Sequence, residues 1–168
     1  MARKMIVTLK NLKVAEFASE ETTCFSATVY LDGKRAMTVK NDGHGGSHFM
    51  EPLNGDRDKF RAAQRQLDAA AAAAPLVDLG FGDGGADFQP DADWLISMAL
   101  EEALHLKDMK RILKKVVGIK AGETGMRTWN VKADAHGIAR VKHHFPGVRI
   151  LNEMSETDAL TLWKKEMG

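Results

Sequence analysis

The fold of this chain is decided by the stretch Phe25-Ser26-Ala27-Thr28-Val29-Tyr30-Leu31-Asp32-Gly33, which continues from Arg35 to Lys40. Apolar and polar residues alternate through its first half, which is typical of a half-buried β-strand. The pair Asp32-Gly33 suits the positive φ angles of a type I′ turn, and the residues from Arg35 onward predict the returning strand. The stretch therefore predicts a β-hairpin near the N-terminus.

On either side of this hairpin the pattern predicts one more strand and two helices. Met5 to Leu9 is rich in β-branched residues and predicts a strand. Residues 56–74 have helical spacing and many alanines, and Pro75 is expected to end that helix. An apolar stripe then predicts a second helix, which begins near Asp91 or Asp93 and runs to Gly118.

The C-terminal part is predicted to return to strands. Apolar and polar residues alternate over residues 129–133, which predicts a strand, and Asp134 to Gly137 resembles a turn. Residues 138–144 and 148–151 then complete a predicted three-stranded meander. Ser155 and Asp158 form a capping-box pattern before a short terminal helix. The predicted fold class is α+β, with an N-terminal β-hairpin sheet, two central helices, a C-terminal β-meander and a short terminal helix.

Length and composition favour one globular domain. The chain has 168 residues, of which 44% are hydrophobic and 28% are charged, as in ordinary globular proteins. We therefore expect a single α+β domain over residues 1–168. Residues 75–92 hold four glycines and two prolines, which predicts a long, mobile Gly/Asp-rich loop within that domain.

Cysteine content and hydropathy bear on location. Cys24 is the one cysteine, which excludes an internal disulfide and suits a reducing compartment. No apolar run is long enough for a membrane span, and the start Met-Ala-Arg-Lys is not followed by the apolar core of a signal peptide. We expect a cytoplasmic protein that has no membrane partner.

The net charge of +1 conceals a strong segregation of charge along the chain. Residues 1–40 carry seven Lys or Arg and four acids, residues 41–104 carry four and twelve, and residues 105–168 carry thirteen and seven. If folding gathers like charges on one face, the resulting field steers charged partners, whereas interleaved segments neutralise it. The sequence leaves both outcomes open.

One segment after the hairpin has the residue types of a site. It reads Asn41-Asp42-Gly43-His44-Gly45-Gly46 and is followed by His48. Its glycines allow positive φ and close approach to a ligand, while Asp42, His44 and His48 offer a charge and two ionisable rings. The segment is predicted to be either a binding loop, made of Asp42, Gly43, His44, Gly45, Gly46 and His48, or a structural turn.

Three kinds of chemistry are compatible with the residue types of this loop. A metal is one, with His44 and His48 joined by Asp42 or Glu51, although the usual metal-binding spacings are missing. A phosphate cradle of backbone N–H groups is another, although neither common glycine-rich fingerprint is matched. An enzyme built on His44 is the third, but no convincing catalytic set is found. No catalytic residue and no cofactor are therefore predicted, the metal question stays open, and an enzyme is the less favoured interpretation.

A basic stretch near the end of the second predicted helix is a candidate contact face. It comprises Lys107, Lys110, Arg111, Lys114 and Lys115. Cations there suit the negative end of a helix dipole, so a structural explanation is available. Together with basic residues of the following strands, they could instead neutralise nucleic-acid phosphates, with Trp129 either stacking on a base or lying in the core.

The N-terminal third carries a resemblance to a protein family. The segments Lys10 to Thr22, Cys24-Phe25, Val29 to Lys34 and Asn41 to Gly46 resemble the opening of small uncharacterised proteins of phages and bacterial mobile elements. The resemblance implies a context rather than a mechanism. Because small accessory proteins of mobile elements often bind host or defence machinery, it favours an antagonist or a regulator. It also implies that the expected location is the cytoplasm of the host bacterium.

Taken together, these features favour a small non-enzymatic interaction protein of phage or mobile-element type, with a host or defence-system protein as its partner. Its target is expected to be a host nucleic-acid-directed defence complex. Two alternatives stay open. One is a small enzyme or a metal- or phosphate-binding protein centred on residues 41–46, and the other is a direct nucleic-acid binder that uses the basic face of residues 107–115.

Overall fold

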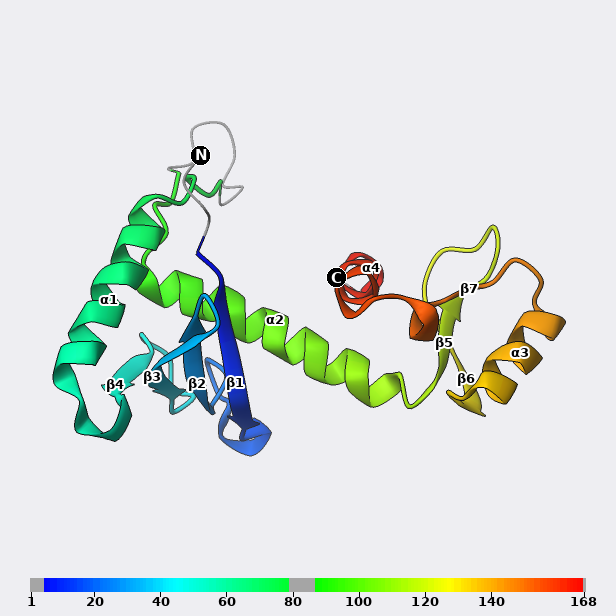
Figure 1. The fold of residues 1–168 in the computed structure, drawn as a ribbon, viewed down its shortest axis with the longest axis horizontal. Helices are drawn as coiled ribbons and strands as arrows, with labels where there is room; N and C mark the ends of the chain where they lie inside the picture. Colours follow the sequence, from blue (N-terminus) through cyan, green and yellow to red (C-terminus); the bar gives the residue numbers. More distant parts are fainter. Residues whose placement is uncertain (1–4, 79–86, 168) are drawn as a thin grey trace. The chain divides into compact units, whose positions relative to one another are not determined.

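The hairpin is the centre of a four-stranded antiparallel sheet in the computed structural model, which describes residues 5–78 and 87–167 (Figure 1). The chain divides into two compact units, unit 1 (Met1–Ala103) and unit 2 (Leu104–Gly168). This division into units does not test the predicted single domain, which stays a prediction. The α+β class is confirmed, and none of the helices in the described ranges has the length and apolar character needed to cross a membrane.

The sheet of unit 1 follows the chain order β1-β2-β3-β4, with every pair antiparallel. Its strands are β1 (Val7–Val14), β2 (Phe25–Leu31), β3 (Lys34–Asn41) and β4 (Phe49–Pro52). The predicted turn is confirmed, since Asp32 and Gly33 both have positive φ, 47° and 80°. A short 3-10 turn, η1 (Glu16–Ala18), lies between β1 and β2, and a second one, η2 (Leu53–Gly55), follows β4.

The two faces of this sheet differ in character. One face carries buried apolar side chains, among them Val29, Met37 and Val39, each at most 2% exposed. Helix α1 (Arg57–Ala72) packs against β3 and β4 and buries Ala63, Leu67 and Ala71. The opposite face carries the polar residues of the alternation, including exposed Ser26 and Lys40. The period-two pattern of the hairpin thus separates a core face from an open face.

The first two helices begin where the sequence predicts them. Asp56 caps α1 by accepting a hydrogen bond from Lys59 N at 3.1 Å, and α2 (Ala92–Ile112) begins after Asp91, whose carboxylate accepts from Trp94 N at 2.7 Å. The loop predicted over residues 75–92 lies in large part, at 79–86, outside the described residues. At its described ends, Val77 and Phe88 form an antiparallel bridge.

The predicted end of the second helix is wrong. Helix α2 ends at Ile112, and the residues that follow form strand β5 (Lys115–Ile119). Val116 and Val117 are fully buried there, so both faces of this strand face apolar surroundings. A strand buried on both faces does not alternate between apolar and polar residues, so its sequence lacks the usual sign of a strand. Val116 has helical spacing from the apolar residues before it only by coincidence, and the predicted helix was therefore too long.

The predicted strand over residues 138–144 is also wrong, because this segment belongs to helix α3 (Ala135–His144). The residues interpreted as a turn form its N-terminus, where the Asp134 carboxylate accepts from Gly137 N at 2.9 Å. A Cβ at Gly137 would collide with the Lys132 carbonyl oxygen, so the glycine permits this close approach. Ile138 and Val141 are three residues apart, which is helical spacing.

The sheet of unit 2 has the order β6-β5-β7 rather than that of a meander. Strands β6 (Arg127–Lys132) and β7 (Arg149–Ile150) flank β5, and a 3-10 turn, η3 (Leu151–Glu153), follows. The terminal helix α4 (Glu156–Met167) confirms the capping box, as Asp158 N donates to Ser155 Oγ at 3.1 Å. Its Trp163 is 4% exposed and belongs to a core cluster with Met109, Val117, Leu151 and Ala159.

Candidate functional site

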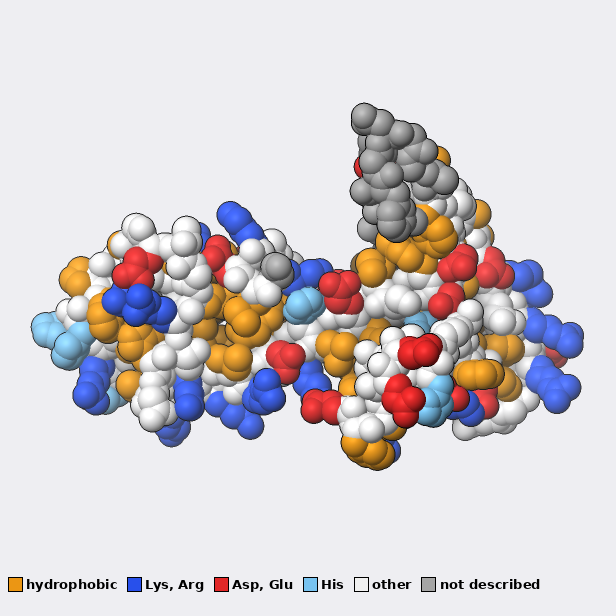
Figure 2. Space-filling model, turned by 180° about the vertical axis from the view of Figure 1, so that it is seen from behind, with side chains coloured by type: hydrophobic (Ala, Val, Ile, Leu, Met, Phe, Trp, Pro, Cys, Tyr) orange, Lys and Arg blue, Asp and Glu red, His pale blue; other side chains and the backbone are white. Residues whose placement is uncertain are grey.

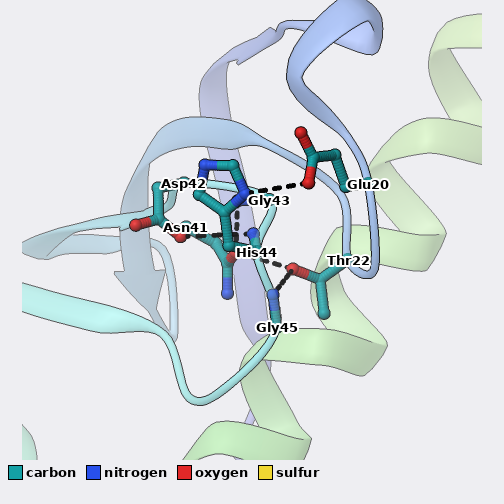
Figure 3. Close-up of polar contacts among 7 residues, drawn as sticks. All are labelled: Glu20, Thr22, Asn41, Asp42, Gly43, His44 and Gly45. Carbon is teal, nitrogen blue, oxygen red and sulfur yellow. Dashed lines mark hydrogen bonds and ion pairs between the residues drawn. The ribbon is translucent and has the colours of Figure 1, made fainter.

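The glycine-rich segment connects β3 to β4 and is built around Asn41, the last residue of β3 (Figure 3). Asn41 is only 3% exposed, and its side chain bonds to several groups. Its Oδ1 accepts from Thr22 Oγ1 and from Gly43 N, both at 2.8 Å, and its Nδ2 donates to the Gly46 carbonyl at 3.3 Å. A buried amide with these partners fixes the loop conformation.

Gly43 joins this loop to the turn that follows β1. Its carbonyl oxygen accepts from the backbone N–H groups of Glu20, Glu21 and Thr22 at 3.1, 2.9 and 3.2 Å. Gly43 has a φ of 90°, and a Cβ at this position would collide with the Ala18 carbonyl oxygen. The glycine is therefore needed for close approach of two backbone segments, which is a structural use of the residue.

Three of the N–H groups that would form a phosphate cradle are bonded within the protein. Gly43 N donates to Asn41, Gly45 N donates to Thr22 Oγ1 at 3.3 Å, and His44 N contacts Asp42 Oδ1 at 3.4 Å. An anion bound to this loop would have to displace these internal acceptors, at a cost in hydrogen bonds. The arrangement favours a structural turn over a preformed anion site.

His48 anchors the loop to helix α2. Its backbone N–H donates to Asp93 Oδ1 at 2.6 Å, and its Nε2 lies 3.0 Å from Ser97 Oγ. Its ring also meets Phe25 edge-on, with 5.2 Å between the ring centroids. All of these partners belong to unit 1, so His48 holds the loop, the sheet and the helix of one unit together.

The partners of Asn41 determine the tautomer of His48. Gly43 N can only donate, so the atom of Asn41 that it contacts is the oxygen, and Nδ2 is the atom that faces His48 Nδ1 at 3.2 Å. An amide nitrogen donates, and therefore His48 Nδ1 accepts and Nε2 carries the proton toward Ser97. Both ring nitrogens are thus hydrogen-bonded within unit 1.

His44 has a different environment. Its Nδ1 lies 3.3 Å from Glu20 Oε2, and the two side chains are 60% and 69% exposed, with the ring turned toward Glu20 in Figure 3. Asp42 is exposed at the start of the loop. In residues 5–78 and 87–167 no group of three or more His, Cys, Asp or Glu side chains is placed to hold a metal ion. The structure therefore does not bring Asp42, His44 and His48 together.

The basic stretch does not form a continuous helix face. Lys107, Lys110 and Arg111 lie on α2, whereas Lys114 follows the helix and Lys115 begins β5. Lys110 pairs with Glu156 at 2.7 Å, and Arg111 pairs with Asp108 at 3.2 Å. Figure 2 likewise shows Lys and Arg at several separate places on the face of unit 2 that it draws. These pairings offset part of the positive charge expected there.

Two carboxylates that cap helices have altered acidity. The hydrogen bond from Gly137 N lowers the pKa of Asp134, with Lys132 and His136 adding a smaller charge effect. The pKa of Asp56 is lowered mainly by the hydrogen bonds from Lys59. Both shifts arise from charge-stabilising bonds at helix N-termini rather than from a catalytic environment.

Several residues that build this site are not found by sequence reasoning. Thr22, Asp93 and Ser97 lie far from the loop in sequence and carry no motif. Asn41 does leave a signal, since it follows Val39 on the core face of β3, where a polar residue is unexpected. Comparisons with protein-family models, with curated proteins and with solved structures found no match to this chain.

Proposed function

We propose that this chain is a non-enzymatic interaction protein of phage or mobile-element type that binds a host or defence-system protein. The observation that carries the proposal is Phe17, which is 94% exposed on the η1 turn. The other large hydrophobic residues described as exposed reach at most 59%. A phenyl ring that is almost entirely in water is available to a partner.

The backbone that carries Phe17 is held in place. Ala18 N donates to the Ala15 carbonyl at 3.0 Å, and Ala15 N donates to the Cys24 carbonyl at 2.9 Å. Ser19 Oγ donates to the Ala15 carbonyl at 3.0 Å and accepts from Cys24 N at 2.9 Å. The carbonyl of Gly43 completes the turn from the other side. Phe17 thus stands on a backbone that needs little ordering when a partner binds.

Burial of such a ring has the magnitude needed for a binding anchor. Removing a phenylalanine side chain from water stabilises a complex by about 1.5–3 kcal/mol. Aromatic residues are enriched at interfaces, and a few anchors carry most of the binding energy. The glycine-rich loop has a role in this proposal, because its Gly43 carbonyl fixes the turn that presents Phe17.

The resemblance of residues 10–46 to the opening of phage and mobile-element proteins favours host machinery as the partner. Within that class, we propose a nucleic-acid-directed defence complex as the target and antagonism as the effect. The internal bonding of His48 and of the loop N–H groups agrees with binding rather than catalysis as the mode of action.

The experiment compares affinity capture by the wild-type chain, Phe17→Ala and Leu76→Ala from a bacterial lysate. Leu76 is a matched control because it is 55% exposed and lies outside the η1 turn. We expect a protein that is retained by the wild type and by Leu76→Ala and is lost with Phe17→Ala. Equal capture by all three proteins, or turnover of a small molecule by the purified chain without any specific partner, would refute the proposal.

A further inference from the structure

The open face of the first sheet is defined by two rows of residues in register across all four strands. The first row is Lys13, Ser26, Lys40 and Phe49, and the second is Lys10, Thr28, Thr38 and Glu51. Cross-strand partners share a face, so these eight side chains lie on the side opposite the buried core. Most of them are exposed, including all three lysines and Phe49, which is 59% exposed.

A bulge in β1 places two lysines on this face. Residues three apart in a regular strand point to opposite faces. The register shifts between Lys10 and Lys13, where Asn11 has a φ of 55°, so that Lys10 opposes Thr28 and Lys13 opposes Ser26. The bulge therefore aligns both side chains with Lys40, which is on the same face two strands away, a separation of about 10 Å.

The charge of the open face is positive. Its three lysines stand against one carboxylate, Glu51, which pairs with Lys40 at 2.9 Å with both side chains about half exposed. Lys10 Nζ lies 4.5 Å from the centroid of the Tyr30 ring, and Lys13 has no ion pair with any residue of the described ranges. The exposed Lys40–Glu51 pair contributes little to stability, so the Lys40 ammonium group can exchange the Glu51 carboxylate for a phosphate of a ligand.

The first row also borders a hollow. Lys13, Ser26, Lys40 and Phe49 all line a surface hollow of about 510 Å³, and the carboxylates of Asp42 and Glu51 also line it. This volume lies in the range of small-ligand sites. The exposed Phe49 ring lies beside Lys40 in register, so a flat ring stacked on Phe49 would bring its attached phosphate to a cationic side chain.

We infer that the open face binds single-stranded nucleic acid, with bases stacked on Phe49 in the hollow and phosphates held by Lys10, Lys13 and Lys40. An acidic peptide would satisfy the lysines but would leave the exposed aromatic ring without a matching partner. A duplex keeps its bases stacked inside and would make only the phosphate contacts. The site adjoins the Phe17 turn, because Ala15 and Cys24 also line the hollow, and it shares no residue with the basic stretch 107–115.

The test measures fluorescence anisotropy of a labelled oligothymidylate of about 15 nucleotides, a length that spans one binding face. Three phosphate contacts predict a slope of log K against log salt of about −2, and Lys13→Gln is expected to reduce its magnitude by about 0.7. Phe49→Ala is expected to weaken binding about 5- to 150-fold, which is the range expected for the loss of one stacking ring. Lys164→Gln, which removes one exposed charge from α4, is the charge-matched control for Lys13→Gln and is expected to leave the affinity unchanged.

Several results would overturn the inference. These are absence of binding at low salt, unchanged affinity after Phe49→Ala, equal affinity for a duplex of the same length, or displacement of the oligonucleotide by polyglutamate at equal charge concentration. Circular dichroism melting of each variant accompanies the titrations, and an unchanged melting temperature assigns a loss of affinity to the site. Phe49 and the lysines are exposed, so their replacement is expected to leave the fold intact.

Discussion

Asn41 Nδ2 lies 3.2 Å from His48 Nδ1 and donates to it, and this hydrogen bond joins the end of β3 to the residue that anchors the loop on α2. The pair is half-buried, and each side chain uses its remaining polar atoms on other segments. His48, one of the two histidines of the predicted binding loop, is therefore a structural residue of unit 1.

Replacing Asn41 by Ala is expected to reduce the free energy of unfolding by about 2–3 kcal/mol. The substitution leaves the Gly43 N–H and the Thr22 hydroxyl without their buried acceptor. Urea denaturation measures the change. Asn41→Asp keeps the acceptor but loses both donors. If the contacts to Gly46 and His48 contribute to stability, the free energy of unfolding of this variant should lie between those of the wild type and Asn41→Ala. A loss below about 0.5 kcal/mol for Asn41→Ala would contradict this network.

The two loop histidines should respond differently to truncation. His48→Ala removes two side-chain hydrogen bonds and a ring contact, and about 1–3 kcal/mol of stability is expected to be lost. His44→Ala removes one exposed pair with Glu20, so a change of less than about 0.5 kcal/mol is expected. Thermal and urea unfolding of both variants provide the comparison. Equal effects would show that His48 is not the anchor described above.

The tautomer of His48 can be observed directly. Nitrogen-15 NMR of the imidazole rings at neutral pH is expected to show a protonated Nε2 and an unprotonated Nδ1 for His48, because Nδ1 accepts from Asn41. In Asn41→Asp the donor is lost, and this preference should weaken. An Nδ1-protonated ring in the wild type would contradict the assigned hydrogen-bond directions.

Gly43 and Gly46 form a matched pair for the glycine-rich loop. Both have positive φ, 90° and 79°, but a Cβ on Gly46 meets open space, whereas one on Gly43 collides with the Ala18 carbonyl oxygen. Gly46→Ala is expected to cost about 1–2 kcal/mol from backbone strain alone. Gly43→Ala should cost about 3 kcal/mol or more, since the two backbone segments must separate. If urea denaturation gave similar losses of unfolding free energy for the two variants, the close approach of Gly43 to Ala18 would not be important for stability.

Helix α3 should lose stability in acid through Asp134. The folded-state pKa of this carboxylate is lowered from its ordinary value of 3.8 by the bond from Gly137 N. Its contribution is therefore fully present above pH 3.8 and is lost as pH falls through the lower folded value. Asp134→Asn keeps a cap that does not titrate, so its melting temperature should fall less steeply with acid than that of the wild type. Parallel pH profiles would contradict the assignment.

The parts of the fold that could be predicted are those with a local cause. The Asp32-Gly33 turn and the Ser155 capping box each depend on residues that are close in sequence, and both are confirmed. Strand β5 and helix α3 were missed because long-range burial decided them. Val116 is buried in a cluster with Val141, Val148 and Ile150 from three later segments, and nothing near it in sequence reveals this.

The glycine-rich segment forms a loop after the hairpin, as predicted, but the bonding within that loop was not predictable. Glycines and histidines suggested a ligand, whereas their partners Glu20, Thr22, Asp93 and Ser97 are contributed by segments more than twenty residues away. Hydrogen bonds between such distant segments depend on the completed fold. The polar Asn41 on a core face was the one local sign of a structural network.

The most direct test of the central claim is calorimetric titration of the purified partner with the wild type, Phe17→Ala and His44→Ala. The claim is that the chain acts by binding through Phe17 on a turn held by the glycine-rich loop. It predicts a loss of affinity of about tenfold or more for Phe17→Ala, from burial of one phenyl ring, and an unchanged affinity for His44→Ala. Unchanged affinity for Phe17→Ala, or a loss with His44→Ala alone, would contradict it.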